Sequence, residues 1–217
     1  YQGFSSWRYL IQRYTSTNPV WANVGGGYLS NGINVWNDSD IICDTKYFYR
    51  IITFDDNDPT AVSFSDTSGC IGFETNPPMP PVILRVTVNK PAKANAEIQL
   101  DWIHSVSTDA TYYNIYRRSS PTQPWQFITQ TGYVNSYLDK KVNTLDSVYE
   151  YRLECVDNCR NTSAVSPDHA TINLSTAPGN NRIFLNWNAY FGFTVDQYEI
   201  YRDGALVNSI PGTQINY

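Results

Sequence analysis

The sequence is poor in the residues on which catalysis and metal binding usually depend. Its 217 residues include two histidines, four cysteines and one methionine, and only 16% of them are charged. The formal net charge of -5 argues against a nucleic-acid partner, which would require clustered Lys and Arg. No apolar run approaches the ~18 residues of a membrane-spanning helix. These figures do not exclude an enzyme, but they leave few residues for catalysis, and we expect no cofactor and no metal.

Aromatic and turn-forming residues, by contrast, are abundant. The chain contains 17 Tyr, 9 Phe, 6 Trp and 12 Pro. Aromatic and β-branched residues favour half-buried pleated surfaces, whereas Asn, Pro and Gly favour turns. In segments such as 149–155 (YEYRLEC), the side chains alternate with period two, which is typical of a strand with one face on a core. The composition and the alternation predict an all-β chain.

An internal repeat divides the chain into modules. The segment YNIYR at 113–117 returns as YEIYR at 198–202 and, more faintly, as YLIQR at 9–13. Further along, YFYRI at 47–51 matches YEYRL at 149–153. The offsets of roughly 104 and 85 residues are those of small β-sandwich domains.

The order of motifs within each module resembles fibronectin type III domains. A Trp lies eleven residues before the tyrosine motif in two modules, at Trp102 and Trp187, and a Tyr-x-Tyr-x-Leu strand follows. The recurrence of these two Trp at one repeat position predicts that they belong to the core. The fold class is therefore predicted as all-β, with tandem fibronectin type III (immunoglobulin-like) β-sandwiches whose terminal domains are incomplete. More narrowly, residues 145–205 are similar to repeats of large secreted Bacteroidetes proteins, which are gliding-motility-associated or type IX secretion substrates with a type B sorting domain.

Aligning the repeats predicts the domain boundaries. Residues 1–76 are expected to form a partial domain without strands A and B. Residues 77–168 are expected to form a complete domain, and residues 169–217 a partial domain without strands F and G. The proline-rich segment 76–81 (NPPMPP) predicts a semi-rigid connection between the first two. We therefore expect the chain to be part of a much longer polypeptide.

The four cysteines are predicted to form two disulfides. Cys43 and Cys70 are symmetric about the turn at 55–58, and Cys155 and Cys159 are symmetric about Asp157. The second pair requires a turn, because residues four apart in an extended strand lie too far apart for a bridge. Free buried thiols, or a metal site that includes His104 or His169, are the alternatives. The metal site lacks the paired Cys-x-x-Cys spacing of structural zinc. Disulfides would indicate an oxidising compartment.

One dense cluster of carboxylates occurs, at Asp55, Asp56 and Asp58. Oxygen ligands suit calcium, but the spacing does not match an EF-hand loop. Asp and Asn are also ordinary residues of hairpin turns, and this second interpretation is favoured.

Exposed aromatic side chains are the other candidate for binding. Trp21 and Trp125 each lie shortly after a proline, in the short strand that follows the tyrosine motif, and Trp36 is the third candidate. These residues are candidate contacts for glycans or protein partners. Packing at the sandwich edge is the favoured alternative, because large aromatic side chains usually bury area.

The function we predict is non-catalytic. The resemblance implies a secreted or cell-surface bacterial protein whose tandem sandwiches serve as a stalk or adhesive filament. The expected partners are other domains of the same polypeptide, outer-membrane secretion or motility machinery, and surface glycans. The alternative is an accessory or glycan-binding module of an extracellular polysaccharide hydrolase.

Overall fold

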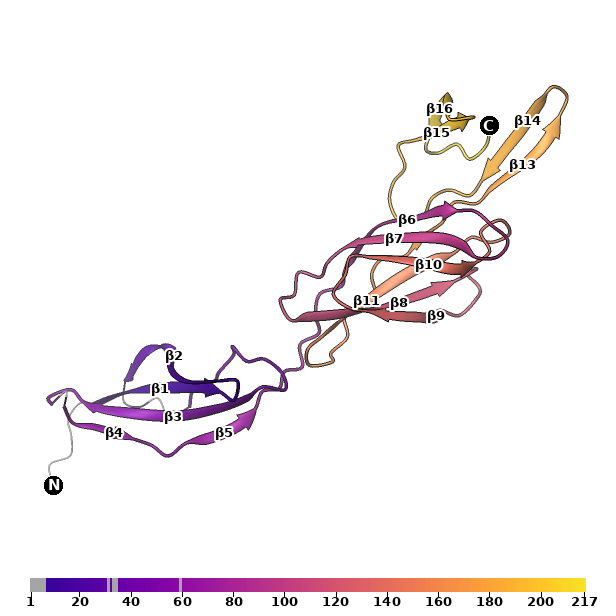
Figure 1. The fold of residues 1–217 in the computed structure, drawn as a ribbon. Helices are drawn as coiled ribbons and strands as arrows, with labels where there is room; N and C mark the ends of the chain where they lie inside the picture. Colours follow the sequence, from indigo (N-terminus) through magenta and orange to yellow (C-terminus); the bar gives the residue numbers. More distant parts are fainter. Residues whose placement is uncertain (1–6, 31, 33–34, 59) are drawn as a thin grey trace. The chain divides into compact units, whose positions relative to one another are not determined.

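Every regular element of the described residues is a β-strand. The computed structural model describes residues 7–30, 32, 35–58 and 60–217, and the chain divides into two compact units, Tyr1–Asn76 and Pro77–Tyr217 (Figure 1). The prediction of an all-β chain is confirmed. The described part of the chain contains no helix with the length and apolarity needed to cross a membrane.

The first unit contains one antiparallel sheet of five strands. They are β1 (Trp7–Thr15), β2 (Asn18–Ser30), β3 (Lys46–Asp55), β4 (Val62–Phe64) and β5 (Ser68–Ile71). Strand β1 lies between β2 and β3, and β3 also pairs with β4 and β5. Within β2, the residues at 25–27 are glycines with positive φ, and they interrupt the pairing with β1. Glycine adopts this backbone conformation without steric cost, so β2 bulges at this point.

The second unit begins with a two-sheet sandwich. Its strands are β6 (Val82–Lys90), β7 (Ala96–Ile103), β8 (Ala110–Arg118), β9 (Gln126–Thr131), β10 (Ser136–Val142), β11 (Glu150–Asp157) and β12 (His169–Ala170). One sheet has the order β10-β7-β6 and the other the order β12-β11-β8-β9, and all neighbours are antiparallel. A sandwich of three and four antiparallel strands in this order is fibronectin type III-like, as the repeat predicted.

The core of this sandwich is formed by alternating residues of the two sheets. Strand β7 contributes Ile98, Leu100 and Trp102, and β11 contributes the facing residues Tyr151 and Leu153. All five side chains are at most 1% exposed, which confirms the core position predicted for Trp102. Burial of such side chains stabilises the fold by about 1.5–3 kcal/mol each.

A charged cluster lies at one edge of this core. Asp139 on β10 is 3% exposed, and its Oδ2 accepts hydrogen bonds from Arg117 on β8 and from the Tyr151 hydroxyl, the latter at 2.9 Å. Burial and the Asp139 carboxylate both raise the pKa of Tyr151, which therefore stays protonated and donates. The guanidinium of Arg117 also lies 5.3 Å over the ring of Tyr149. Asp139, Arg117 and Tyr151 thus supply one another's charge or hydrogen-bond partners at this buried edge.

The C-terminal part of the second unit adds two hairpins. They are formed by β13 (Leu174–Gly179) with β14 (Arg182–Trp187), and by β15 (Gln197–Arg202) with β16 (Ala205–Pro211). Tyr190 attaches this part to the sandwich: its hydroxyl lies 2.9 Å from His169 Nδ1 and accepts the Val86 N–H at 3.1 Å. Trp187 is half-buried here, unlike Trp102. The division of the unit into domains 77–168 and 169–217 stays a prediction.

The buried charged cluster generates a first prediction. Replacing Asp139 by Asn should destabilise the sandwich by about 3–5 kcal/mol, because the Arg117 charge would lose its partner in a buried position. Replacing Asp101 by Asn should cost under ~1 kcal/mol, because Asp101 pairs with Arg85, whose side chain is 64% exposed. Native-state hydrogen exchange of β8 and β11 amides in the whole chain measures both values. Equal destabilisation by Asp139→Asn and Asp101→Asn would show that the buried cluster contributes no more to stability than the exposed ion pair.

Candidate functional site

The outer face of the β11-β8-β9 sheet carries a stack of cationic and aromatic side chains. The guanidinium of Arg118 lies 4.5 Å from the ring centroid of Trp125, and that of Arg152 lies 4.3 Å from it. Arg152 also lies 5.9 Å over Tyr116, which meets Phe127 edge-on at 5.8 Å. These five residues form what we call the sandwich ladder. Its members come from β8, from β11 and from residues 125–127 at the start of β9, so its contacts connect three segments of the chain.

Acidic side chains surround the sandwich ladder and fix its cations. Arg118 donates to Glu150 Oε2, with a distance of 2.7 Å from Nε, and the Tyr116 hydroxyl donates to Glu154 at 2.8 Å. Burial, together with Glu154, raises the pKa of Tyr116 to about 12. Nε of Arg152 is buried and makes no hydrogen bond among the described residues, and its guanidinium lies over the rings of Trp125 and Tyr116.

The first unit contains a second stack at the corresponding place. Arg50 on β3 lies 4.3 Å over the ring of Trp21, and Tyr14 meets Trp21 edge-on at 4.5 Å. Tyr14 in turn stacks on Phe48 at 4.6 Å, and Lys46 Nζ lies 5.0 Å over Phe48. We call these five residues the N-terminal ladder. The repeat places Trp21 and Arg50 where the sandwich has Trp125 and Arg152, so the two modules use one packing device.

The structure thus assigns packing contacts to Trp21 and Trp125. Both rings are half-buried and have a guanidinium over them. Trp36, the third candidate, lies apart from the ladders: its indole Nε1 is 3.0 Å from where a side chain on Gly25 would begin, so the β2 bulge makes room for it. Sequence reasoning missed the arginines. One signal was available in the sequence: Arg50 and Arg152 occupy equivalent positions of the repeat, and so do Trp21 and Trp125.

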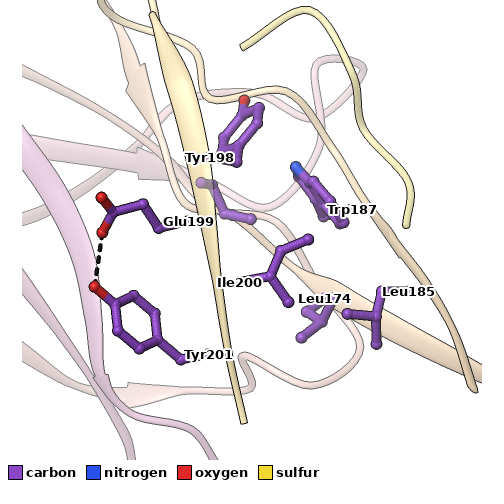
Figure 2. A pocket seen from close by; sticks show the side chains of 8 residues that line it. Leu174, Leu185, Trp187, Tyr198, Glu199, Ile200 and Tyr201 are labelled. Carbon is purple, nitrogen blue, oxygen red and sulfur yellow. Dashed lines mark hydrogen bonds between the residues drawn. The ribbon is translucent and has the colours of Figure 1, made fainter. Parts of the chain in front are cut away.

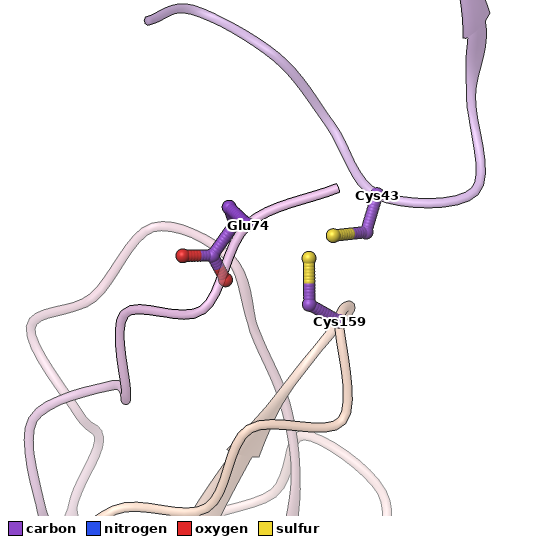
Figure 3. Close-up of side chains that lie close together, drawn as sticks. All are labelled: Cys43, Glu74 and Cys159. Carbon is purple, nitrogen blue, oxygen red and sulfur yellow. The ribbon is translucent and has the colours of Figure 1, made fainter. Parts of the chain in front are cut away.

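The predicted disulfides are wrong. Cys70 and Cys155 are free cysteines, one exposed and one buried, so each predicted pair contains a free thiol. Cys43 and Cys159, drawn in Figure 3, are the disulfide-bonded residues. Burial raises the pKa of the Cys155 thiol, which lies in the core.

Two details of backbone geometry explain the error. The β3–β4 connection is longer than expected, because Asp55 N–H bonds to Ala61 O across residues 56–60, and the register pairs Cys70 with Tyr47. In the other predicted pair, Cys155 points into the core from β11. Cys159 follows on a turn in which Arg160 N–H bonds to Asp157 O. The turn after Asp157, in which Cys159 lies beyond the end of β11, therefore separates the two thiols.

The predicted carboxylate cluster makes the contacts of turn residues. Asp55 Oδ1 accepts the Asn57 N–H at 2.9 Å, and Asp58 Oδ1 accepts the Thr60 N–H at 3.0 Å and its hydroxyl at 2.6 Å. These hydrogen bonds lower the pKa of Asp58, with the Thr60 hydroxyl as the largest cause. Asp56 forms an ion pair with Arg8 at 3.0 Å.

The two histidines each contact a tyrosine. His104 Nδ1 lies 3.0 Å from the Tyr113 hydroxyl, and its ring stacks on Tyr133 at 4.1 Å. His169 is 4% exposed and shares a hydrogen bond with Tyr190, and burial lowers its pKa.

An apolar cleft lies between the two C-terminal hairpins. It has a volume of about 230 Å³ and is lined by Leu174, Leu185, Trp187, Tyr198 and Ile200, among others (Figure 2). Along β15, Tyr198 and Ile200 lie on one side of the strand, and Glu199 and Tyr201 on the other, and all four contribute to the lining. The Tyr201 hydroxyl donates a hydrogen bond of 2.7 Å to Glu199.

Comparisons with known proteins give fold likeness only. No protein-family model and no curated protein matches the chain. Among solved structures it is similar to the FN1-FN3 domains of chicken CNTN1, with 16% identity and a TM-score of 0.41 over 77% of this chain and 55% of that one. It is also similar to titin kinase with its flanking domains (18%, 0.35, 43% and 16%) and to a myokine structure (20%, 0.33, 43% and 94%). The chain spans little more than half of the CNTN1 fragment. All three TM-scores are low, and the sandwich assignment rests on the strand order.

The sandwich ladder generates a second prediction. Trp125→Leu and Arg152→Gln should each destabilise the sandwich, and the double variant should lose less than the sum by about 1 kcal/mol, because each single change already removes the cation–π contact. Hydrogen exchange of β8 and β11 amides measures the three values. Arg152→Gln combined with Gln126→Ala, an exposed neighbour of Trp125, should be additive. Additive losses for Arg152 and Trp125 would show that the contact contributes nothing.

The cysteines generate a third prediction, which thiol labelling tests. Without denaturant, a maleimide should label Cys70 alone, because Cys155 is buried and its thiol is kept protonated. Cys155 should become reactive on unfolding, and Cys43 and Cys159 only after reduction. A Cys70→Ser variant supplies the unlabelled native control. A peptide map that shows Cys155 bridged to Cys159 would overturn the assignment.

Proposed function

We propose that the chain is a non-catalytic structural segment of a secreted or cell-surface protein, in which tandem sandwiches serve as a stalk or adhesive filament. The observation that carries this proposal is the ladder that recurs in two modules. In each, an arginine lies 4.3 Å over a tryptophan: Arg50 of β3 over Trp21 of β2, and Arg152 of β11 over Trp125, which immediately precedes β9. Each contact crosses the strand that lies between (β1 in the first unit, β8 in the sandwich), so side chains connect segments that backbone hydrogen bonds do not pair directly. A repeated module that must keep its shape under mechanical load benefits from side-chain contacts of this kind in addition to its backbone hydrogen bonds.

Other features agree with this proposal. The proline-rich segment before β6 is held on the sandwich, because Pro78 and Pro81 are buried and the Met79 N–H donates to Ser107 Oγ at 2.8 Å. Proline-rich connectors act as semi-rigid spacers. Disulfide-bonded Cys43 and Cys159 are typical of proteins from oxidising compartments.

The finer parts of the proposal rest on the resemblance of residues 145–205 to secreted Bacteroidetes repeats. They are export by type IX secretion, a role in gliding, and contact with outer-membrane machinery or with further domains of the same polypeptide. Detection of the native protein on intact cells by surface proteolysis, and its loss from the surface when type IX secretion is blocked, would support them. A protein that stays inside the cell would contradict them.

Force spectroscopy tests the structural role and supplies a fourth prediction. When the whole chain is pulled by its ends with reductant present, the sandwich should open in one step that lengthens the chain by roughly 300 Å, at ~3.3–3.6 Å per residue. Trp125→Ala should lower the force of this step, because the sandwich ladder joins β8, β9 and β11. Gln126→Ala, next to it and exposed, is the matched control. Gradual extension without a step, or an unfolding force that Trp125→Ala leaves unchanged, would contradict the proposed structural role.

A further inference from the structure

Contacts of two kinds hold the C-terminal part of the second unit on the sandwich. One kind uses a neutral amide: the side chain of Asn173 donates to the Thr144 carbonyl at 2.7 Å and to the Leu145 carbonyl at 3.1 Å. The other is the contact of Tyr190 with His169. An amide does not titrate, whereas a histidine changes its charge near neutral pH. The second contact is therefore the one that can respond to pH.

The contacts of the Tyr190 hydroxyl determine the protonation state of His169. Its oxygen accepts the Val86 N–H at 3.1 Å and lies 2.9 Å from His169 Nδ1. In the part of the chain that the structure describes, Nδ1 is the one acceptor bonded to this hydroxyl. Tyr190 therefore donates its proton to Nδ1, and His169 is neutral, with its own proton on Nε2. The contact requires an unprotonated Nδ1.

A positive charge on His169 would have no partner among the described residues. The residue is 4% exposed, and on β11 it lies opposite Tyr151, whose hydroxyl donates to Asp139. Strand β6 presents the buried Val86. Charged residues of the neighbouring segments pair elsewhere or are exposed: Arg85 with Asp101, Glu150 and Asp168 with Arg118, Arg152 over Trp125, and Asp196 in solvent. Burial is accordingly the cause that lowers the pKa of His169.

The loop that carries Tyr190 lies directly on the imidazole ring. Gly192 has a φ of +138°, a conformation that favours glycine, and a Cβ at this position would collide with the ring of His169. The Phe191 carbonyl of the same loop accepts the Ala170 N–H at 2.8 Å. Because the loop covers the ring so closely, hydration of Nδ1 requires the loop to lift from the sandwich.

We propose that His169 and Tyr190 form a pH-dependent contact, the latch, that closes the C-terminal hairpins onto the sandwich at neutral pH and releases them in acid. A proton taken up from solvent by Nδ1 would place two donors face to face and leave a buried charge without a carboxylate. Both costs disappear when the loop lifts, because the imidazolium and the hydroxyl then bind water. The amide of Asn173 does not titrate, so its contact remains as the pivot. The latch lies within the second unit and does not rest on the role proposed above.

Amide hydrogen exchange of the whole chain, followed by NMR, tests the latch. The reporters are the Val86 and Ala170 amides, because their acceptors are the Tyr190 hydroxyl and the Phe191 carbonyl. The open form takes up the proton more readily, so closure loses stability as the pH falls. An exposed imidazole with a pKa of ~6.5 is protonated ~30:1 at about pH 5, so both protection factors should fall by up to about 30-fold from about pH 7.5. The Ser166 amide, which bonds within the sandwich, should not change.

Three variants separate the latch from a general effect of acid. His169→Gln keeps an acceptor but does not titrate, so the protection of Ala170 should become independent of pH. His104→Gln removes the other histidine and is the matched control, in which the pH dependence should persist. Tyr190→Phe should leave Ala170 poorly protected at both pH values, and an NMR titration should show the pKa of His169 raised toward ~6.5.

The proposal is overturned if the protection factors of the unchanged chain do not vary with pH, or if they vary as strongly in His169→Gln. Loss of the pH dependence in His104→Gln would assign the effect to the other histidine and would also overturn it. If His169→Gln does not fold, the Tyr190→Phe titration decides, because an unchanged pKa of His169 would show that Tyr190 does not control its protonation.

Discussion

The pairing of β11 with β8 is the constraint on which the sandwich depends. This register places Tyr151, Leu153 and Cys155 in the core and Glu150 and Arg152 on the outer face. Because side chains alternate along a strand, a slip by one residue would exchange the two sets and bury charges. The buried cluster of Asp139, Arg117 and Tyr151 opposes such a slip, since its hydrogen bonds form in one register only. Core packing and polar contacts therefore specify the same alignment.

The outer face shows how a half-exposed sheet surface is used for cohesion. Arg118 and Arg152 have long side chains whose charges would ordinarily remain in water, but here they lie over Trp125 and meet Glu150 or an aromatic ring. In the first unit Arg50 and Trp21 repeat the arrangement, although the surrounding strands differ. The recurrence of a guanidinium over a tryptophan in both modules indicates that this contact is part of how the modules pack.

The sequence predicts this architecture well because strand alternation and repeats are local patterns. The all-β class, the sandwich and the core position of Trp102 could all be read from spacing. The ladders could not, because Trp125 and Arg152 lie 27 residues apart and meet only after β11 pairs with β8. The disulfides failed for a related reason. Their prediction required the exact register of a hairpin, and one longer turn after Asp55 moved Cys70 opposite Tyr47.

The ladders also bear on the solvent in which such a chain can work. At ~1 M salt the Debye length falls to ~3 Å, and attraction between exposed opposite charges is largely lost. A guanidinium that lies directly on an aromatic ring excludes water and ions from the contact, so it depends less on ionic strength. The stabilisation that such contacts contribute should therefore fall less between low and high salt than the stabilisation from an exposed ion pair such as Arg85 and Asp101 of the same sandwich.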